Sequence, residues 1–438
     1  MLTTGGSLSF STDTLKFDTV FTSLGSATRQ IKLYNLVSSP IKISNIKIQN
    51  GAVSPFRLNV DGIAGKSIDD ILIAPNDSIY IFVAVTINPN VDSLPFIVED
   101  KIIVTLNENE YDIDLQAYGQ NAHYINGAYI GTETWQNDKP YVIINSAAVD
   151  TGEILTIQKG CRIYMNQNSK LIVFGSLLAF GTKEDSVIFQ GDRLDRDYFN
   201  YKDYPGEWQG IYFASTSFGS KLNYTVLKNG GGQEATIYLS ESPNRLLTMN
   251  NCELYNSLNF GIFAISSNFQ ANNCLIHTCG QQNVAMVKGG NYEMNYCTLA
   301  TFGGIGFNHT KYNVLAALNY IQISQTQFEY GNLETRFNNC IIYGPNDNET
   351  FFGKDANATF FAETKNCIIK QKDGLSADVT QINTLLNQDP LFEDIGKWDF
   401  HVRASSPAKN SGVSIAAFPI DLENKTRNAT QPTIGCFE

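Results

Sequence analysis

The chain has 438 residues, of which 43% are hydrophobic and 17% charged, a composition typical of folded proteins long enough for more than one domain. It contains no run of about 18 apolar residues, so no segment is predicted to span a membrane. A net charge of -12 would repel a phosphate backbone, and nucleic acid is therefore excluded as an expected partner. Acids and bases nearly balance between residues 204 and 346, at 7 against 6, so this part should suit a neutral ligand better than a polyanion.

Residues 8–118 contain short runs in which apolar and polar residues alternate, such as TRQIKLYNL, SIYIFVAVTI and KIIVTL. Alternation with a period of two is typical of half-buried strands, and turn-rich pieces such as SSP and APND separate the runs. About seven strands without a helical pattern predict an antiparallel β-sandwich over residues 1–123. The stretch FTSLGSATRQIKLYNLVSSPIKISNIKI resembles the opening strands of bacterial immunoglobulin-like domains of the abnormal-spindle and major-sperm-protein kind. This resemblance implies a spacer or docking module without chemistry of its own.

After residue 123 a short unit recurs, as NNCELY, NNCLIH, NYCTLA, NNCIIY and KNCIIK. Its cysteines are separated by 22, 23, 43 and 27 residues, and they are Cys252, Cys274, Cys297, Cys340 and Cys367. A period near 22, with 43 counted as two turns, predicts a solenoid of short strands. Asparagine tolerates left-handed turns and can stack in hydrogen-bonded ladders, so the Asn pair is expected between two strands of each coil.

The cysteines of the repeat are expected to form a column of buried, free thiols rather than a metal site. No CxxC pair is present, and the four histidines, His123, His277, His309 and His401, are scattered along the chain. The sequence therefore predicts no metal site.

Two further stretches resemble secreted right-handed parallel β-helix proteins. GEILTIQKGCRIYMNQNSKLIVFGSLLAFGTKEDSVIFQG is similar to their entry coils, and DPLFEDIGKWDFHVRASSPAKNSGV with DLENKTRNATQPTIGCFE is similar to their C-terminal tails. The resemblance implies an all-β chain in which a pectate-lyase-like solenoid spans residues 124–385 and residues 386–438 pack on or cap it. Surface proteins of this kind in Bacteroidetes imply an extracellular or outer-membrane location on a Gram-negative cell, with a lipid anchor whose cysteine this chain does not contain.

Parallel β-helices include polysaccharide lyases and glycoside hydrolases, so catalysis is an alternative that the residues must support. A hydrolase needs two carboxylates in one groove, but no aspartate lies between Asp203 and Asp347, and the glutamates there share no position in the repeat. A lyase needs a basic residue, often with calcium, and the candidates are Lys288 with Glu293 nearby, Arg245 and Arg336. Each is more typical of a solvated coil residue. No cofactor is predicted, and Ca²⁺ would be needed only by a lyase.

The stretch GDRLDRDYFNYKDYPGEWQG, residues 191–210, has neither helical nor strand periodicity and is expected to be an insertion between two coils. As a lid, its five aromatic residues would cover apolar surface; they are Tyr198, Phe199, Tyr201, Tyr204 and Trp208. As a ligand site, exposed rings among them would lie beside carboxylates, namely Asp192, Asp195, Asp197 and Asp203. The lid interpretation is favoured, because aromatic residues in loops cover apolar surface more often than they remain exposed to bind a ligand.

Three hypotheses for function remain open. The leading one is a secreted or surface-attached, non-catalytic protein that binds a glycan or acts as a scaffold in polysaccharide utilisation. The second is a polysaccharide lyase or glycosidase, and the third is a purely structural or adhesive protein. Exposed clusters of Tyr and Trp would favour the first, because flat aromatic rings stack on the apolar faces of sugars while nearby polar groups bind hydroxyls.

Overall fold

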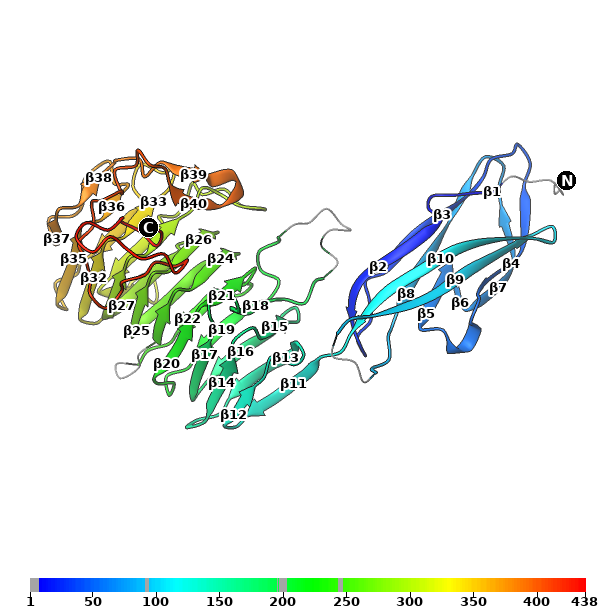
Figure 1. The fold of residues 1–438 in the computed structure, drawn as a ribbon, viewed down its shortest axis with the longest axis horizontal. Helices are drawn as coiled ribbons and strands as arrows, with labels where there is room; N and C mark the ends of the chain where they lie inside the picture. The colour runs from blue at the N-terminus through cyan, green and yellow to red at the C-terminus, as the bar shows by residue number, and fades with distance from the viewer. Residues whose placement is uncertain (1–7, 91–93, 195, 197–202, 243–246) are drawn as a thin grey trace. The chain divides into compact units, whose positions relative to one another are not determined.

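The computed structural model describes residues 8–90, 94–194, 196, 203–242 and 247–438. The chain divides into two compact units, the first built mainly from residues 1–122 and the second beginning at His123 (Figure 1). Strands dominate both units, and the described residues contain short 3-10 turns but no α-helix. No helix in the described part of the chain is long and apolar enough to cross a membrane.

The first unit consists of two five-stranded sheets, with strand orders β1-β3-β8-β5-β6 and β2-β10-β9-β4-β7. The strands are β1 (Leu8–Phe10), β2 (Thr14–Phe21), β3 (Arg29–Asn35), β4 (Ile41–Ile48), β5 (Phe56–Val60), β6 (Ile63–Gly65), β7 (Ser67–Ile73), β8 (Ser78–Val85), β9 (Phe96–Leu106) and β10 (Asn109–Gln120). All pairings are antiparallel except β2 with β10, which is parallel. Alternate residues such as Ile31, Leu33 and Ile81 are fully buried between the sheets, as the period-two pattern predicts. The predicted sandwich sheets are thus present.

The second unit is one 26-stranded sheet in which a strand pairs in parallel with the corresponding strand of the next coil. The chain visits three columns of strands in turn, an arrangement consistent with a parallel β-helix. It begins with β11 (His123–Ile130) and β13 (Tyr141–Val149), whose two halves belong to different columns.

The first column continues through β16 (Lys170–Val173), β19 (Gly210–Phe213), β22 (Ala235–Leu239), the first halves of β25 (Phe260–Asn272) and β27 (Val284–Asn295), β29 (Leu315–Leu318) and β34 (Thr350–Gly353). The second contains β12 (Glu133–Trp135), β14 (Ile154–Gln158), β17 (Ser176–Phe180), β20 (Ser220–Asn223), β23 (Leu247–Asn250), the second halves of β25 and β27, β32 (Leu333–Asn338), β35 (Phe360–Lys365) and β37 (Val379–Ile382). The third contains β15 (Arg162–Met165), β18 (Val187–Gly191), β21 (Thr225–Lys228), β24 (Glu253–Ser257), β26 (Leu275–Cys279), β28 (Thr298–Ala300), β33 (Ile341–Tyr343), β36 (Ile368–Ile369) and β38 (Leu385–Leu386).

The recurring Asn pair forms the turn between the second and third columns, as predicted. The second Asn of the pair adopts a left-handed conformation, with φ of 53° at Asn251, 51° at Asn273 and 54° at Asn339. The first Asn of each pair donates its side-chain amide to the preceding coil, in a ladder of 2.8–2.9 Å bonds through Asn223, Asn250, Asn272, Asn295 and Asn338. Both halves of the pair therefore stabilise the stacking of coils.

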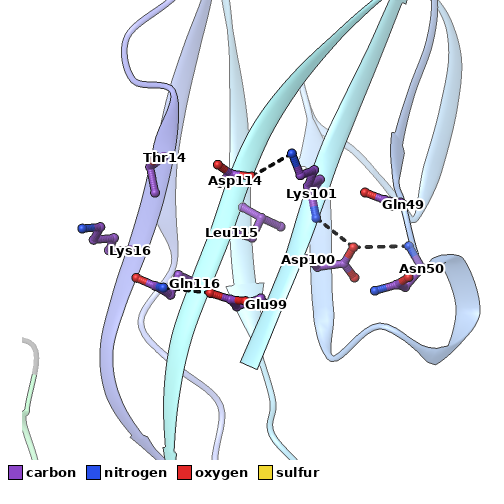
Figure 2. Close-up of a pocket in the computed structure, with 10 residues that line it drawn as sticks. All are labelled: Thr14, Lys16, Gln49, Asn50, Glu99, Asp100, Lys101, Asp114, Leu115 and Gln116. Atoms are coloured by element: carbon purple, nitrogen blue, oxygen red, sulfur yellow. Dashed lines mark hydrogen bonds and ion pairs between the residues drawn. The ribbon is translucent and has the colours of Figure 1, made fainter. Parts of the chain in front are cut away.

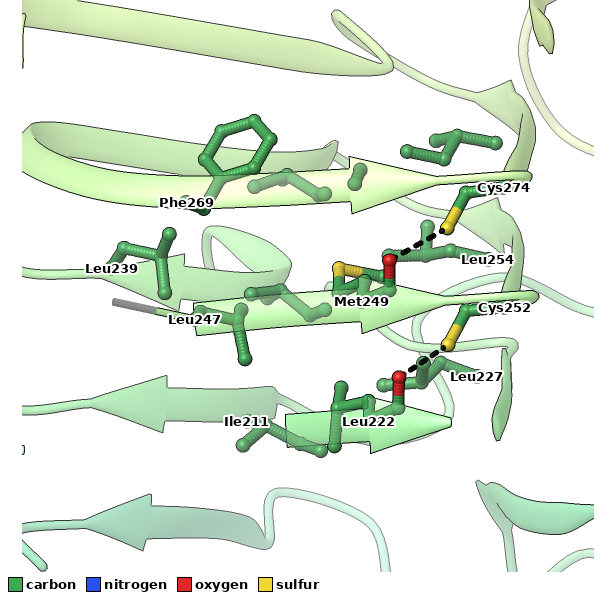
Figure 3. Packing of buried hydrophobic residues seen from close by; sticks show 14 of the residues in the cluster. Ile211, Leu222, Leu227, Leu239, Leu247, Met249, Cys252, Leu254, Phe269 and Cys274 are labelled. Carbon is green, nitrogen blue, oxygen red and sulfur yellow. Dashed lines mark hydrogen bonds between the residues drawn. The ribbon is translucent and has the colours of Figure 1, made fainter. Parts of the chain in front are cut away.

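The cysteine that follows each Asn pair points into the solenoid core, and the predicted column of free thiols is confirmed. Figure 3 shows the Cys252 thiol donating to the carbonyl of Leu222 at 3.2 Å and the Cys274 thiol donating to that of Met249 at 3.6 Å. Each thiol thus satisfies a carbonyl of the preceding coil while it packs among apolar side chains.

The thiols are expected to be unreactive in the folded protein. All five repeat thiols are fully buried, which disfavours the charged thiolate and keeps reagents away from the sulfur atoms. Titration with a thiol reagent should detect essentially none of the eight cysteines in buffer and all of them in denaturant. Rapid labelling of the repeat cysteines in the native protein would contradict this packing.

The interpretation of the 43-residue spacing as two turns is wrong. Asn295 pairs directly with Asn338, so Cys297 and Cys340 lie on consecutive coils. The additional residues form two insertions at the ends of β29, residues 301–314 and 319–332, and the second contains the hairpin β30 (Tyr320–Gln322) and β31 (Phe328–Tyr330). Strand pairing is indifferent to the length of the connecting turn, and spacing alone therefore miscounts coils.

The C-terminal residues pack on the third column, starting with β39 (Phe392–Asp394) and β40 (Asp399–Val402). Phe400, Leu422 and Ile434 form one apolar cluster with Leu275 and Ile341 of the third column. The left-handed asparagines bind the same segment, because their side-chain amides donate to backbone carbonyls of residues 413–421 at 2.8–3.0 Å. The repeat thus holds the coils together and also anchors the tail.

Candidate functional site

The base of the loop 191–210 is built into the solenoid. Trp208 is fully buried in the core and donates its indole N–H to the carbonyl of Lys228 at 2.8 Å. The Asp203 carboxylate accepts from the Asn229 amide at 3.0 Å, and the Asn229 side chain accepts from Asn256 at 2.8 Å. Asp203 therefore ends a second asparagine ladder, and Trp208 acts as a core residue.

The rest of this loop does not decide between lid and ligand site. Asp192 accepts a hydrogen bond from the Asn166 amide at 2.7 Å, and Tyr204 is 42% exposed. The remaining candidates lie outside the described residues, namely Asp195, Asp197, Tyr198, Phe199 and Tyr201. Of the described aromatics, Trp208 is buried as the lid interpretation predicts, whereas Tyr204 is not.

The candidate lyase residues are not assembled around a general base. The Lys288 ammonium lies 2.7 Å from the carboxylates of both Glu241 and Glu329. Hydrogen bonds to these two carboxylates raise the pKa of Lys288, so it stays protonated at neutral pH and is poorly suited to accept a proton. Its position, linking the turn after β22 to the hairpin β30–β31, suits a structural clamp.

Glu293 and Arg336 lie opposite each other on β27 and β32 in the second column, away from the Lys288 clamp. Glu293 accepts hydrogen bonds from the side chains of Gln270 and Asn295, at 3.2 and 3.1 Å. Arg336 pairs with Glu334 and lies over the ring of Phe361. Arg245 lies outside the described residues. No set of three His, Cys, Asp or Glu side chains that could hold a metal ion is present in the described ranges.

The outer face of the first column contains a hollow of about 300 Å³. Its lining comes from three consecutive coils, with β16, β19 and β22 contributing, and the side chains that matter are Lys170, Gln209, Tyr212, Gln233, Glu234 and Tyr238. Outward positions of paired parallel strands fall in register, so Tyr212 lies directly beside Tyr238. Parallel pairing thus gathers residues that are far apart in the sequence.

The two tyrosines of the hollow stack on each other. Their ring centroids are 4.5 Å apart with the planes 9° apart, and Phe263 continues the row at 5.7 Å from Tyr238. Because the two rings cover each other's faces, a ligand in the hollow would contact their edges and hydroxyl groups. Burial raises the pKa of Tyr238 to about 12, so its hydroxyl stays protonated and can donate a hydrogen bond at neutral pH.

Three polar side chains of the hollow have no bonding partner among the described residues. Among the described residues, neither a hydrogen bond nor an ion pair engages the side chains of Lys170, Gln233 and Glu234. The Lys170 ammonium lies 5.8 Å from the ring of Tyr212, and Gln209 donates to Asn168 at 3.2 Å. Unengaged donors and acceptors beside aromatic edges are the features that a polar ligand of moderate size requires.

A larger hollow, about 610 Å³, lies on the sheet β2-β10-β9-β4-β7 of the sandwich (Figure 2). Some of its polar groups bind one another: Lys101 lies 3.2 Å from Asp114, and Gln116 donates to Glu99 at 2.9 Å. The Asp100 carboxylate accepts from the backbone N–H of Lys101 at 2.8 Å. Within the described ranges, the side chains of Thr14, Lys16, Gln49 and Asn50 form no hydrogen bond or ion pair, but the lining of this hollow contains no aromatic side chain, unlike that of the first-column hollow.

The sequence interpretation missed the first-column hollow. A signal was present in GIYF, TIYL and GIFA, residues 210–213, 236–239 and 261–264, where an outward aromatic follows an inward isoleucine in three successive coils. These segments lack the Asn-Asn-Cys unit, and the repeat therefore did not draw attention to them.

The fold and the hollow define an all-β protein with a sandwich unit and a large parallel sheet, with a polar-aromatic recess on that sheet. No protein-family model and no curated protein matches the chain. Among solved structures, it is similar to a family 123 glycoside hydrolase from Clostridium perfringens, described for glycolipid glycan hydrolysis, with 13% identity and a TM-score of 0.20 over 29% of this chain and 31% of that one. It is also similar to the Agl-KA catalytic domain, with 12% identity and a TM-score of 0.28 over 83% and 78% of the two chains.

Proposed function

We propose that this protein is a non-catalytic glycan-binding protein whose site is the first-column hollow. The observation that carries the proposal is the set of unengaged side chains, Lys170, Gln233 and Glu234, beside the stacked Tyr212 and Tyr238. Sugar hydroxyls both donate and accept hydrogen bonds, so an ammonium, an amide and a carboxylate can all bind them. Ring edges supply apolar contact for the C–H groups of the sugar.

The ligand proposed for this hollow is a neutral saccharide. Lys170 and Glu234 contribute one positive and one negative charge, and residues 204–346 are nearly balanced overall. A polyanion would gain little from such a surface, whereas a neutral sugar would use both charges in charge-assisted hydrogen bonds.

The same proposal includes the setting of the site. The fold is taken to be a right-handed, pectate-lyase-like parallel β-helix behind an immunoglobulin-like spacer, in a Bacteroidetes-type protein attached by lipid to the outer surface of a Gram-negative cell. Support comes from the resemblance of the entry coils and of the C-terminal segment to secreted β-helix proteins. Glycan capture at a cell surface would serve polysaccharide utilisation.

Binding without catalysis fits the groups that the hollow contains. Glycoside hydrolysis uses two carboxylates on opposite sides of the scissile bond. Glu234 is the one carboxylate among the described residues that line this hollow, and the protonated Lys288 is held in its clamp.

Replacing Gln233 or Glu234 in the hollow should weaken binding of the saccharide without lowering the stability of the protein. The test is a panel of neutral and acidic polysaccharides, with and without calcium, followed by titration of the best ligand into wild-type protein and the variants Gln233→Ala and Glu234→Gln. Each variant should weaken binding by about tenfold, since a hydrogen bond to a ligand is worth about 1–2 kcal/mol. Gln270→Ala, on the outer face of the second column, is the matched control and should bind like wild type.

Other outcomes would redirect the assignment. Release of shorter saccharides from any polymer of the panel would show an enzyme and refute the non-catalytic proposal. Absence of binding across the panel would favour a structural or adhesive role.

A further inference from the structure

The sheet β1-β3-β8-β5-β6 of the sandwich has an outer face on which aromatic and basic residues lie together. Tyr80 and Phe82 point outward from β8, 36% and 37% exposed, with ring centroids 5.7 Å apart and planes 15° apart. Lys32 on β3 pairs with Tyr80 and holds its ammonium 4.8 Å from that ring. Gln30 and Asn59 pair with Phe82 from either side, so amide groups flank the second ring. We call Tyr80, Phe82, Lys32, Arg57, Gln30 and Asn59 the basic-aromatic face.

In the part of the chain that the structure describes, the cations of this face have no acidic partners. Strands β3, β5 and β8, with sequences RQIKLYN, FRLNV and SIYIFVAV, contain no Asp or Glu. Within the described ranges neither Lys32 nor Arg57 forms an ion pair, and Arg57 donates to the hydroxyl of Thr86. Hydrogen bonding to Tyr80 raises the pKa of Lys32, which keeps its ammonium charged.

The opposite sheet of the sandwich shows the contrast. Three of its lysines are paired with acids: Lys42 with Asp70 at 2.6 Å, Lys47 with Glu110 at 3.9 Å, and Lys101 with both Asp112 and Asp114. Figure 2 shows the pair of Lys101 with Asp114. A chain of net charge -12 has enough carboxylates to neutralise its cations, and on this sheet it does so for these three lysines, although Lys16 on β2 forms no ion pair with any described residue. On the basic-aromatic face it leaves two cations beside two exposed rings.

We propose that the basic-aromatic face binds an acidic glycan, a polysaccharide whose sugar rings carry carboxylate groups. The rings of Tyr80 and Phe82 contact the C–H faces of the sugars, Lys32 and Arg57 bind the acid groups, and Gln30 and Asn59 bind hydroxyls. The sandwich is then a binding module in its own right, distinct in location and in charge preference from the first-column hollow.

The chemistry of the face favours a glycan over other anions. Recognition of anionic membranes by basic residues typically uses clusters of about 4–8 Lys or Arg, whereas this face has two. A nucleic acid carries a phosphate on every nucleotide, so the net charge of -12 opposes it more strongly than a glycan in which only some of the sugars carry an acid group. Amides that flank an exposed ring add groups that can bind the hydroxyls of a sugar.

The test is titration of carboxymethyl-dextran, dextran and polyglutamate into the full chain at low and moderate salt. Comparing the three polymers separates the contribution of the sugar rings from that of the charge. Carboxymethyl-dextran should bind more tightly than dextran, and the double variant Lys32→Gln/Arg57→Gln should lose about tenfold in affinity and most of the salt dependence. Tyr80→Ala/Phe82→Ala should lose a similar factor for carboxymethyl-dextran, with little change for polyglutamate, which has no sugar ring. Lys42→Gln removes the same type of charge from the opposite sheet and should change affinity less than twofold.

Three results would overturn this proposal: no binding of carboxymethyl-dextran, an equal loss in Lys42→Gln, or equal loss of polyglutamate binding in the aromatic variant. The charge variant tests the face even if the aromatic double variant fails to fold. Gln233→Ala in the first-column hollow should leave carboxymethyl-dextran binding to this face unchanged, so failure of one site is distinguishable from failure of the other.

Discussion

Replacing Trp208 with alanine is expected to lower the free energy of unfolding by about 3–5 kcal/mol, the range for truncating a buried large aromatic residue. The indole is fully buried in the solenoid core, and its N–H satisfies the carbonyl of Lys228. The substitution leaves a cavity at the start of β19 and removes a hydrogen bond, and the core can collapse around it only in part. Urea denaturation followed by circular dichroism measures the effect.

Tyr204→Ala is the matched control for Trp208→Ala, because it removes an aromatic ring from the same loop at a position that is 42% exposed. Its expected cost is below about 1 kcal/mol, as for surface substitutions. If both variants were equally mild, Trp208 would not be the core residue described here. If both were equally severe, the loop as a whole would be a packing element.

Replacing Arg427 with glutamine is expected to cost about 3 kcal/mol and to loosen the C-terminal segment. Its guanidinium is nearly fully buried, donates to the Asn273 side chain at 2.9 Å and to the carbonyl of Gly435 at 3.1 Å, and lies 3.9 Å over the ring of Tyr296. Loss of this group leaves the amide oxygen of Asn273 and the carbonyl of Gly435 without their donor, and breaking a buried charged network typically costs several kcal/mol.

The Arg427→Gln variant can be followed by trypsin, which cleaves after Lys409 and Lys425 once the segment detaches. Faster cleavage there, with the solenoid core still protected, is the expected pattern. Arg403→Gln is the control, since the Arg403 side chain is 54% exposed and its partner Glu393 is also at the surface. Equal protease resistance of wild type and Arg427→Gln would contradict the anchoring role of Arg427.

The repeat made the stacking of coils predictable. Asn-Asn-Cys encodes a left-handed turn, an amide ladder and an inward thiol at once, so Asn251, Asn273 and Asn339 could be placed in equivalent turns from sequence alone. The number of coils between Cys297 and Cys340 could not be predicted from the sequence. Insertions lengthen the connections between strands, but they do not change the pairing of Asn295 with Asn338. Strand periodicity in the sandwich likewise predicted which side chains face inward, such as Ile31 and Leu33, but not the parallel pairing of β2 with β10.

The candidate sites were harder to predict, because they depend on which residues the pairing of coils brings together. Local composition drew attention to the loop 191–210, yet Trp208 and Asp203 serve the core and an asparagine ladder. The first-column hollow combines Lys170 with Gln233 and Glu234, and only the register of three coils brings them together. No single segment of the chain predicts which residues of neighbouring coils lie close together.

The most direct test of the proposed function is a crystal structure of the full chain with the neutral saccharide that binds best in the panel. A sugar is expected in the hollow on the first column, within hydrogen-bonding distance of the side chains of Gln233 and Glu234 and in contact with the edges of Tyr212 and Tyr238. A saccharide bound elsewhere, with this hollow left empty, would contradict the assignment of the site.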